Sequence, residues 1–229
     1  MMKRTVVATV SGAVLLGMAG TGWAQETKAL YPAMAPVEQY RSADEVALAR
    51  SAANEAVSRD AEVLVLGSRG YETAAKGTNG FVCVVERSWA VNFDNPQFWN
   101  PKLRAPHCFN AAAARSVLPA YLKRTELVLS GMPKDQVEVQ MKEAVAKKVF
   151  GAPEQGAMCY MMSKQSYLND TVGHWHPHVM FFLPAMDAAS WGANLEGSQV
   201  FAAQGNPEPV TTFIVPVMAW SDGTVEEMK

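Results

Sequence analysis

Hydrophobic and polar residues alternate over several short stretches, which is the pattern typical of β-strands. Residues 62–66 are rich in β-branched side chains, residues 71–76 form a second stretch, and residues 81–89 give the clearest apolar run. Glycine-containing turn signals separate the three stretches. The pattern predicts three strands joined as an antiparallel meander, with Glu86 and Arg87 at a solvated strand end.

Helical patterns follow a different period. A capping box opens a predicted helix over residues 42–58, whose apolar face is mostly alanine. A second helical region begins after Asn110, is broken or restarted at Pro119, and can end at Gly131 in the left-handed conformation. Pro133 starts a further helix, in which apolar residues recur every four positions.

Strand patterns return in the C-terminal third of the chain. The candidates, separated by turns rich in Gly, Asn, Asp and Pro, are residues 157–162, 179–183, 199–203 and 211–217. This order of elements predicts an α+β fold with a mainly antiparallel sheet and two to four helices. We expect a single compact domain over residues 42–229, preceded by an N-terminal arm at residues 25–41.

The first 24 residues have the composition of a secretory signal peptide. Lys3 and Arg4 form a basic start, an uncharged apolar run follows, and Gly22 and Ala24 suit a cleavage site. Cleavage would give a mature chain that begins at Gln25 and is located in the periplasm or the extracellular space. The alternative is that the segment stays attached as an N-terminal anchor.

The net charge and the absence of several motifs limit which binding partners we expect. Loss of Lys3 and Arg4 changes the formal net charge from −2 to −4, and no basic stripe is present, so nucleic acid is not an expected partner. No apolar segment of the mature chain is long enough to span a membrane. Phosphate-binding, nucleophile-elbow and Cys-x-x-Cys motifs are absent, so no nucleotide cofactor is indicated. The partner we expect is a small molecule or a cell-envelope component.

Three cysteines remain in the mature chain, at positions 83, 108 and 159. Disulfides persist in oxidising compartments, and an odd count allows at most one bridge within the chain. We expect Cys83–Cys108, because this bridge ties a strand to the long loop that follows it. Cys159 is then a buried thiol or a soft metal ligand.

The sequence Gly-His-Trp-His-Pro-His at residues 173–178 holds three of the four histidines. Imidazole is a common ligand of transition metals. Pro177 favours an extended chain, in which His174, His176 and His178 point to one side. Proline also has no N–H to donate to a neighbouring β-strand, so we expect an edge strand or the entry to one. The pattern therefore predicts a transition-metal site at the margin of the sheet.

Distance limits how this site can be built. Residues four apart on a strand are about 13 Å apart, so His176 and only one neighbour can share an ion. The remaining ligands must come from elsewhere, and His107 is the only other histidine. Thioether or thiolate ligands would favour copper, and carboxylate ligands would favour zinc. Two alternatives stay open: the histidines act as acid or base without a metal, or they are structural in a non-catalytic binding module.

Overall fold

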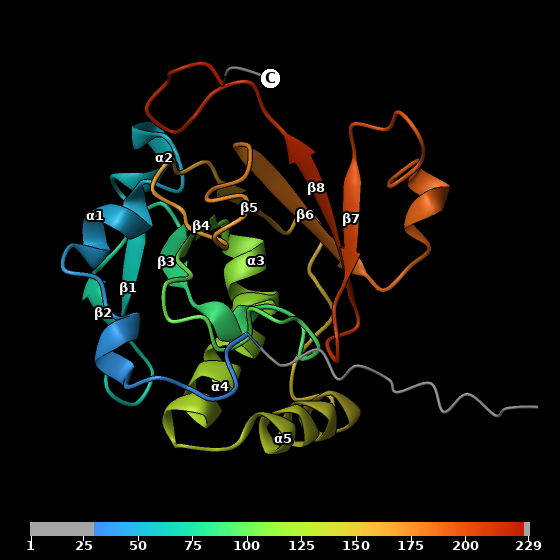
Figure 1. The fold of residues 1–229 in the computed structure, drawn as a ribbon. Coiled ribbons are helices and arrows are strands. Elements are labelled where there is room, and N and C mark those ends of the chain that lie inside the picture. The colour runs from blue at the N-terminus through green and yellow to red at the C-terminus, as the bar shows by residue number, and fades with distance from the viewer. Residues whose placement is uncertain (1–29, 227–229) are drawn as a thin grey trace, which may run out of the picture.

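One eight-stranded sheet organises residues 30–226, the part of the chain that the computed structural model describes. The strands are β1 (Glu62–Leu66), β2 (Tyr71–Ala75), β3 (Val82–Glu86), β4 (Ala105–Phe109), β5 (Met158–Met161), β6 (His178–Pro184), β7 (Phe201–Gln204) and β8 (Val210–Pro216). Their order across the sheet is β2-β1-β3-β4-β5-β6-β8-β7, so β2 and β7 form its two edges (Figure 1). All neighbouring strands are antiparallel except β1 and β3. The predicted single α+β domain with a mainly antiparallel sheet is confirmed, whereas the predicted signal peptide lies outside the described residues.

The first three strands do not form the predicted meander. β1 lies between β2 and β3, and it pairs antiparallel with β2 but parallel with β3. Glu72, Thr73 and Ala74 of β2 are exposed, whereas the three central residues of β3 are buried. A meander would place the polar strand β2 inside the sheet, while the edge position keeps its charged side chain in water.

Five α-helices of residues 30–226 accompany the sheet: α1 (Glu45–Arg50), α2 (Glu55–Ser58), α3 (Ala111–Ser116), α4 (Leu118–Leu129) and α5 (Lys134–Ala146). This is one more than the predicted upper number, because the helix expected over residues 42–58 is divided in two. Asn54 caps the second part with its side chain, and Asp44 rather than Ser42 caps the first. Pro119 lies in the first turn of α4 and separates it from α3, as predicted.

The α1 side of the sheet has a small core built around the disulfide. Cys83 and Cys108 lie opposite each other on β3 and β4, and a disulfide joins them, with Cα atoms 4.0 Å apart. Ala49 of α1 and Val63 of β1 pack in the same buried cluster. The predicted pairing is confirmed, and Cys159 is a buried free thiol.

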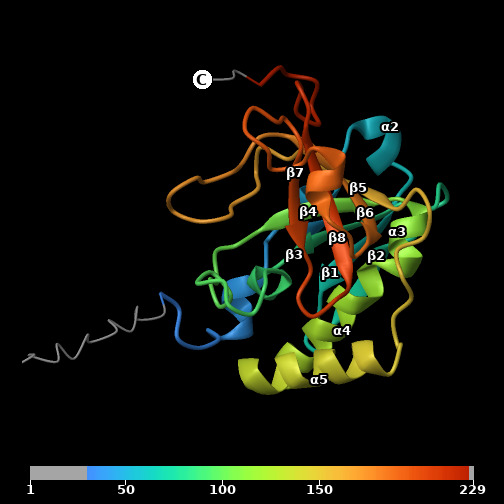
Figure 2. The ribbon, with the colours of Figure 1, turned by 90° about the vertical axis from the view of Figure 1, so that its right-hand side faces the viewer.

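The opposite side of the sheet carries the larger core. Figure 2 shows α3 and α4 beside the strands and α5 at the end of the molecule away from α2. Trp89, Phe109, Val128 and Met141 belong to this buried cluster. Trp89 also donates a hydrogen bond from Nε1 to Thr125 Oγ1 of α4, at 2.8 Å. The helices therefore have a fixed position over β3 to β5, and the candidate site lies on this side.

Candidate functional site

The three histidines of the run contact different parts of the molecule. The exposed ring of His174 lies edge-on against Trp220, with ring centroids 4.9 Å apart. Nδ1 of His176 lies 3.1 Å from Oε1 of Glu226. His178 is buried, and its Nδ1 lies 2.7 Å from the backbone carbonyl oxygen of His176.

The run is neither an edge strand nor the entry to one, so this prediction is wrong. β6 begins only at His178, and it lies between β5 and β8 inside the sheet. Pro177 precedes the ladder, so its missing N–H does not interrupt the strand. Trp175 contacts the ring of His178, with centroids 4.9 Å apart, instead of facing away from it. The alternation that would point the three histidines to one side is therefore absent.

The fourth histidine lies apart from the run in sequence but on the same sheet. His107 is buried in β4, between β3 and β5. Within residues 30–226, no group of three or more His, Cys, Asp or Glu side chains is arranged to hold a metal ion. The structure thus does not gather His174, His176, His178 and His107 around one point. Binding of zinc or copper through these residues stays a prediction.

A cleft of about 780 Å³ lies between the sheet and the helices α3 to α5. Met180 and Phe182 of β6 and Ile214 of β8 line it from the sheet, and Ala120 lines it from α4. The loop before β8 and the segment after α5 complete the lining, with Lys148 exposed at the margin. A cleft of this volume is within the range of small-molecule sites in proteins.

Strand register explains the apolar floor. Met180 lies directly opposite Ile214 on β8 and opposite Cys159 on β5, so the three side chains share one face. Phe182, two residues further along β6, points to the same face because side chains alternate along a strand. The apolar positions of β5, β6 and β8 therefore meet beneath α4.

Glu86 is the acidic side chain at the end of β3, and it lines this cleft. Its side chain is only 13% exposed, so the predicted solvated strand end is wrong. Val82, Val84 and Glu86 alternate onto the same face, and α4 covers that face. Burial raises the pKa of Glu86 to about 8, although the nearby Arg124 acts in the opposite direction. The carboxyl group is therefore mostly protonated at pH 7.

Arg124 closes the cleft between α4 and the loop before β8. Its Nη2 lies 2.7 Å from both carboxylate oxygens of Glu208, and its Nη1 donates to the Trp89 and Val91 carbonyl oxygens at 3.1 and 2.9 Å. The guanidinium also lies over the Phe93 ring, 4.5 Å from its centroid. The positive charge of Arg124 is therefore paired within the protein. Its contacts hold α4 and the loop before β8 together as one wall of the cleft.

Tyr121 forms the adjoining wall and is held in a buried network. Its hydroxyl accepts a hydrogen bond from the backbone N–H of Arg87 at 2.8 Å and lies 2.9 Å from the Tyr71 hydroxyl. Tyr71 in turn donates to the Val85 carbonyl oxygen at 2.6 Å. Burial raises the pKa of Tyr71 and of Tyr121, so neither phenol ionises near neutral pH. This end of the cleft is therefore fixed by internal hydrogen bonds.

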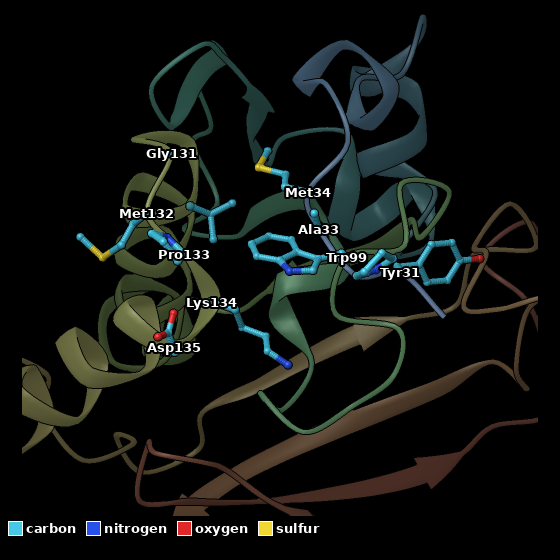
Figure 3. A pocket seen from close by; sticks show the side chains of 11 residues that line it. Tyr31, Ala33, Met34, Trp99, Gly131, Met132, Pro133, Lys134 and Asp135 are labelled. Atoms are coloured by element: carbon cyan, nitrogen blue, oxygen red, sulfur yellow. The ribbon is translucent and has the colours of Figure 1, made fainter. Parts of the chain in front are cut away.

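A second cavity, of about 520 Å³, lies between the N-terminal arm and the turn from α4 to α5. Figure 3 shows the Trp99 indole in this cavity between Met34 and Lys134. Lys134 Nζ donates to the Phe93 carbonyl oxygen at 3.0 Å. The cleft of about 780 Å³ contains the buried Glu86 and the longer apolar floor, so it is the stronger candidate for a ligand-binding site.

Comparison with known proteins does not assign a function to this cleft. No protein-family model, curated protein or solved structure matches the chain. Among residues 30–226, no helix combines the length and the apolar composition needed to cross a bilayer. The function can therefore be inferred only from the residues and the geometry of the cleft.

Proposed function

We propose that this protein binds a small, largely apolar molecule in the cleft between the sheet and α4, as a non-catalytic binding module. The observation that carries the proposal is the apolar floor of Met180, Phe182 and Ile214, next to one buried acid. Small-molecule sites are commonly apolar clefts with a few polar groups that fix the orientation of the ligand.

The contacts of the other polar groups in the cleft support binding over catalysis. Arg124 is bonded to Glu208 and to backbone carbonyls, and the Tyr121 hydroxyl is used by Arg87 and Tyr71. Groups held in this way shape a wall and leave the apolar floor as the main contact surface. The three histidines of residues 174–178 are structural in this proposal, as their separate partners favour.

We also propose that binding takes place outside the cytoplasm, in the periplasm or the extracellular space. The Cys83–Cys108 disulfide supports this location, because such bonds persist mainly in oxidising compartments. The signal-peptide pattern of the first 24 residues supports it independently. The partner is then a small molecule that is present at or beyond the cell envelope.

A cleft-filling variant tests the proposal with Nile red, an uncharged apolar dye whose fluorescence rises in apolar surroundings. The dye should bind the wild-type protein with saturation and a stoichiometry of one. Ala203 is an exposed residue of edge strand β7 that lines the cleft. We expect Ala203→Trp to weaken dye binding at least tenfold, because the indole would occupy the space that the dye needs.

Ala74→Trp is the matched control for this experiment. Ala74 is an exposed alanine of the other edge strand, β2, and it lies outside the cleft. This variant should bind the dye as the wild type does. Equal dye affinity in wild type and Ala203→Trp, or equal losses in both tryptophan variants, would contradict the proposal.

A further inference from the structure

Two acidic side chains line the cleft, Glu86 and Glu208, and Glu86 is the one that forms no ion pair with a lysine or arginine. Arg124, the nearby guanidinium, is bonded to Glu208 through both carboxylate oxygens. The Glu86 side chain is nevertheless 87% buried, which is costly for a carboxyl group without a hydrogen-bond partner. Such a group is expected to have a partner in the protein or in a ligand.

His107 lies next to Glu86 and can serve as this partner. It lies on β4 opposite Val84, one position along the same face from Glu86. Its Nδ1 is 3.5 Å from Oε2 of Glu86, is buried, and makes no hydrogen bond. Burial, with a smaller effect of the neighbouring His178, lowers the pKa of His107 to about 3. At pH 7 the imidazole is therefore neutral, and its Nδ1 can accept a hydrogen bond from the O–H of a neutral carboxyl group.

This pairing leaves one carboxyl oxygen free for a ligand. If Oε2–H of Glu86 donates to His107, the second oxygen is a carbonyl-type acceptor, and no described residue donates a hydrogen bond to it. We propose that Glu86, oriented by His107, accepts a hydrogen bond from the hydroxyl group of an uncharged, largely apolar ligand. This inference rests on the proposed binding function, and it names the chemical class of the ligand.

The surrounding groups favour an uncharged ligand. The titratable or charged groups near Glu86 are Tyr71 of β2, Tyr121 and Arg124 of α4, His107 of β4 and Cys159 of β5. Both phenols, the imidazole and the thiol are neutral at pH 7, and Glu208 compensates the charge of Arg124. A carboxylate ligand beside Glu86 would face Arg124, whose charge Glu208 already compensates, and an ammonium ligand there would lie near a guanidinium. Either charge would be buried without a good partner.

Four ligands with the same eight-carbon chain test the ligand class. They are 1-octanol, 1-methoxyoctane, octanoate and octylammonium, each used to displace Nile red from the wild-type protein at pH 7. Nile red has no hydrogen-bond donor, so it reports occupancy of the cleft without using the proposed contact. We expect 1-octanol to bind about fivefold more tightly than its methyl ether, as one hydrogen bond implies. Both ions should bind more weakly than the alcohol.

Two variants of Glu86 then test whether this residue causes the preference for the alcohol over the ether. Glu86→Gln keeps a donor toward His107 and a carbonyl oxygen toward the ligand, so it should keep the preference for the alcohol over the ether. Glu86→Leu has no polar group, so the alcohol should fall to the affinity of the ether while Nile red still binds. Retained Nile red binding shows that the leucine variant is folded.

The outcomes separate the two proposals. If the wild type does not bind Nile red, or if Ala203→Trp leaves binding unchanged, the cleft is not a binding site and both proposals fail. If the dye binds in the cleft but the alcohol and the ether compete equally, only the role of Glu86 fails. It also fails if an ion binds most tightly, or if Glu86→Leu keeps the preference for the alcohol.

Discussion

Replacement of Arg87 by methionine should lower the free energy of unfolding by about 3–5 kcal/mol, the loss expected when one partner of a buried ion pair is removed. The Arg87 side chain is fully buried, and its Nη2 lies 2.6 Å from Oε2 of Glu45. Its Nε also donates to the Tyr40 carbonyl oxygen at 2.6 Å. The variant would leave the Glu45 carboxylate buried without its cation. Urea unfolding at pH 7, followed by circular dichroism, measures the change.

Two further variants control this experiment. Arg59→Met removes a guanidinium that is 65% exposed and pairs with the exposed Glu55, so the expected change is within about 0.5 kcal/mol. The double variant Glu45→Met/Arg87→Met removes both buried charges and should be more stable than Arg87→Met alone. Similar losses in Arg87→Met and Arg59→Met would show that the buried pair is not formed.

Removal of the disulfide should have the second largest effect. The double variant Cys83→Ala/Cys108→Ala is expected to lose about 3 kcal/mol of stability, because the bridge joins positions 25 residues apart and restricts the unfolded chain. Cys159→Ala keeps the bridge, and its loss should be close to about 1 kcal/mol, the usual result of a single buried substitution. Urea unfolding of the oxidised proteins gives both values.

Thiol labelling checks the pairing itself. Unfolded, unreduced protein treated with iodoacetamide should carry one label, at Cys159. After reduction, Cys83 and Cys108 should also be labelled. A label on either of these two residues before reduction would contradict the bridge, and so would equal stability of the double variant and the wild type.

Local sequence patterns predicted helices, strands and turns well where these depend only on neighbouring residues. The turn at Gly131, the helix start near Pro119 and the strand at residues 211–217 depend on backbone preference and short-range alternation. Strand order depends on contacts between distant residues. The sequence predicted a meander, although the polar residues Glu72 and Thr73 already favoured an edge position for their strand.

The candidate site was harder to predict, for a related reason. Three histidines close together in sequence suggested one site, but their side chains have separate partners in the fold. The sequence predicts a solvated Glu86, because this residue carries a charge at a strand end. Its alternation with Val82 and Val84 was the available signal that it faces the same side as the core. That α4 covers this side could not be read from local periodicity.

The most direct test of the binding cleft is an assigned ¹H–¹⁵N correlation spectrum of the wild-type protein, recorded during titration with Nile red. The account predicts saturable shifts that concentrate on β6, β8 and α4, with Met180, Phe182, Ile214 and Ala120 among the most affected residues. Shifts confined to the cavity around Trp99 or to residues 174–178, with the cleft unchanged, would contradict it.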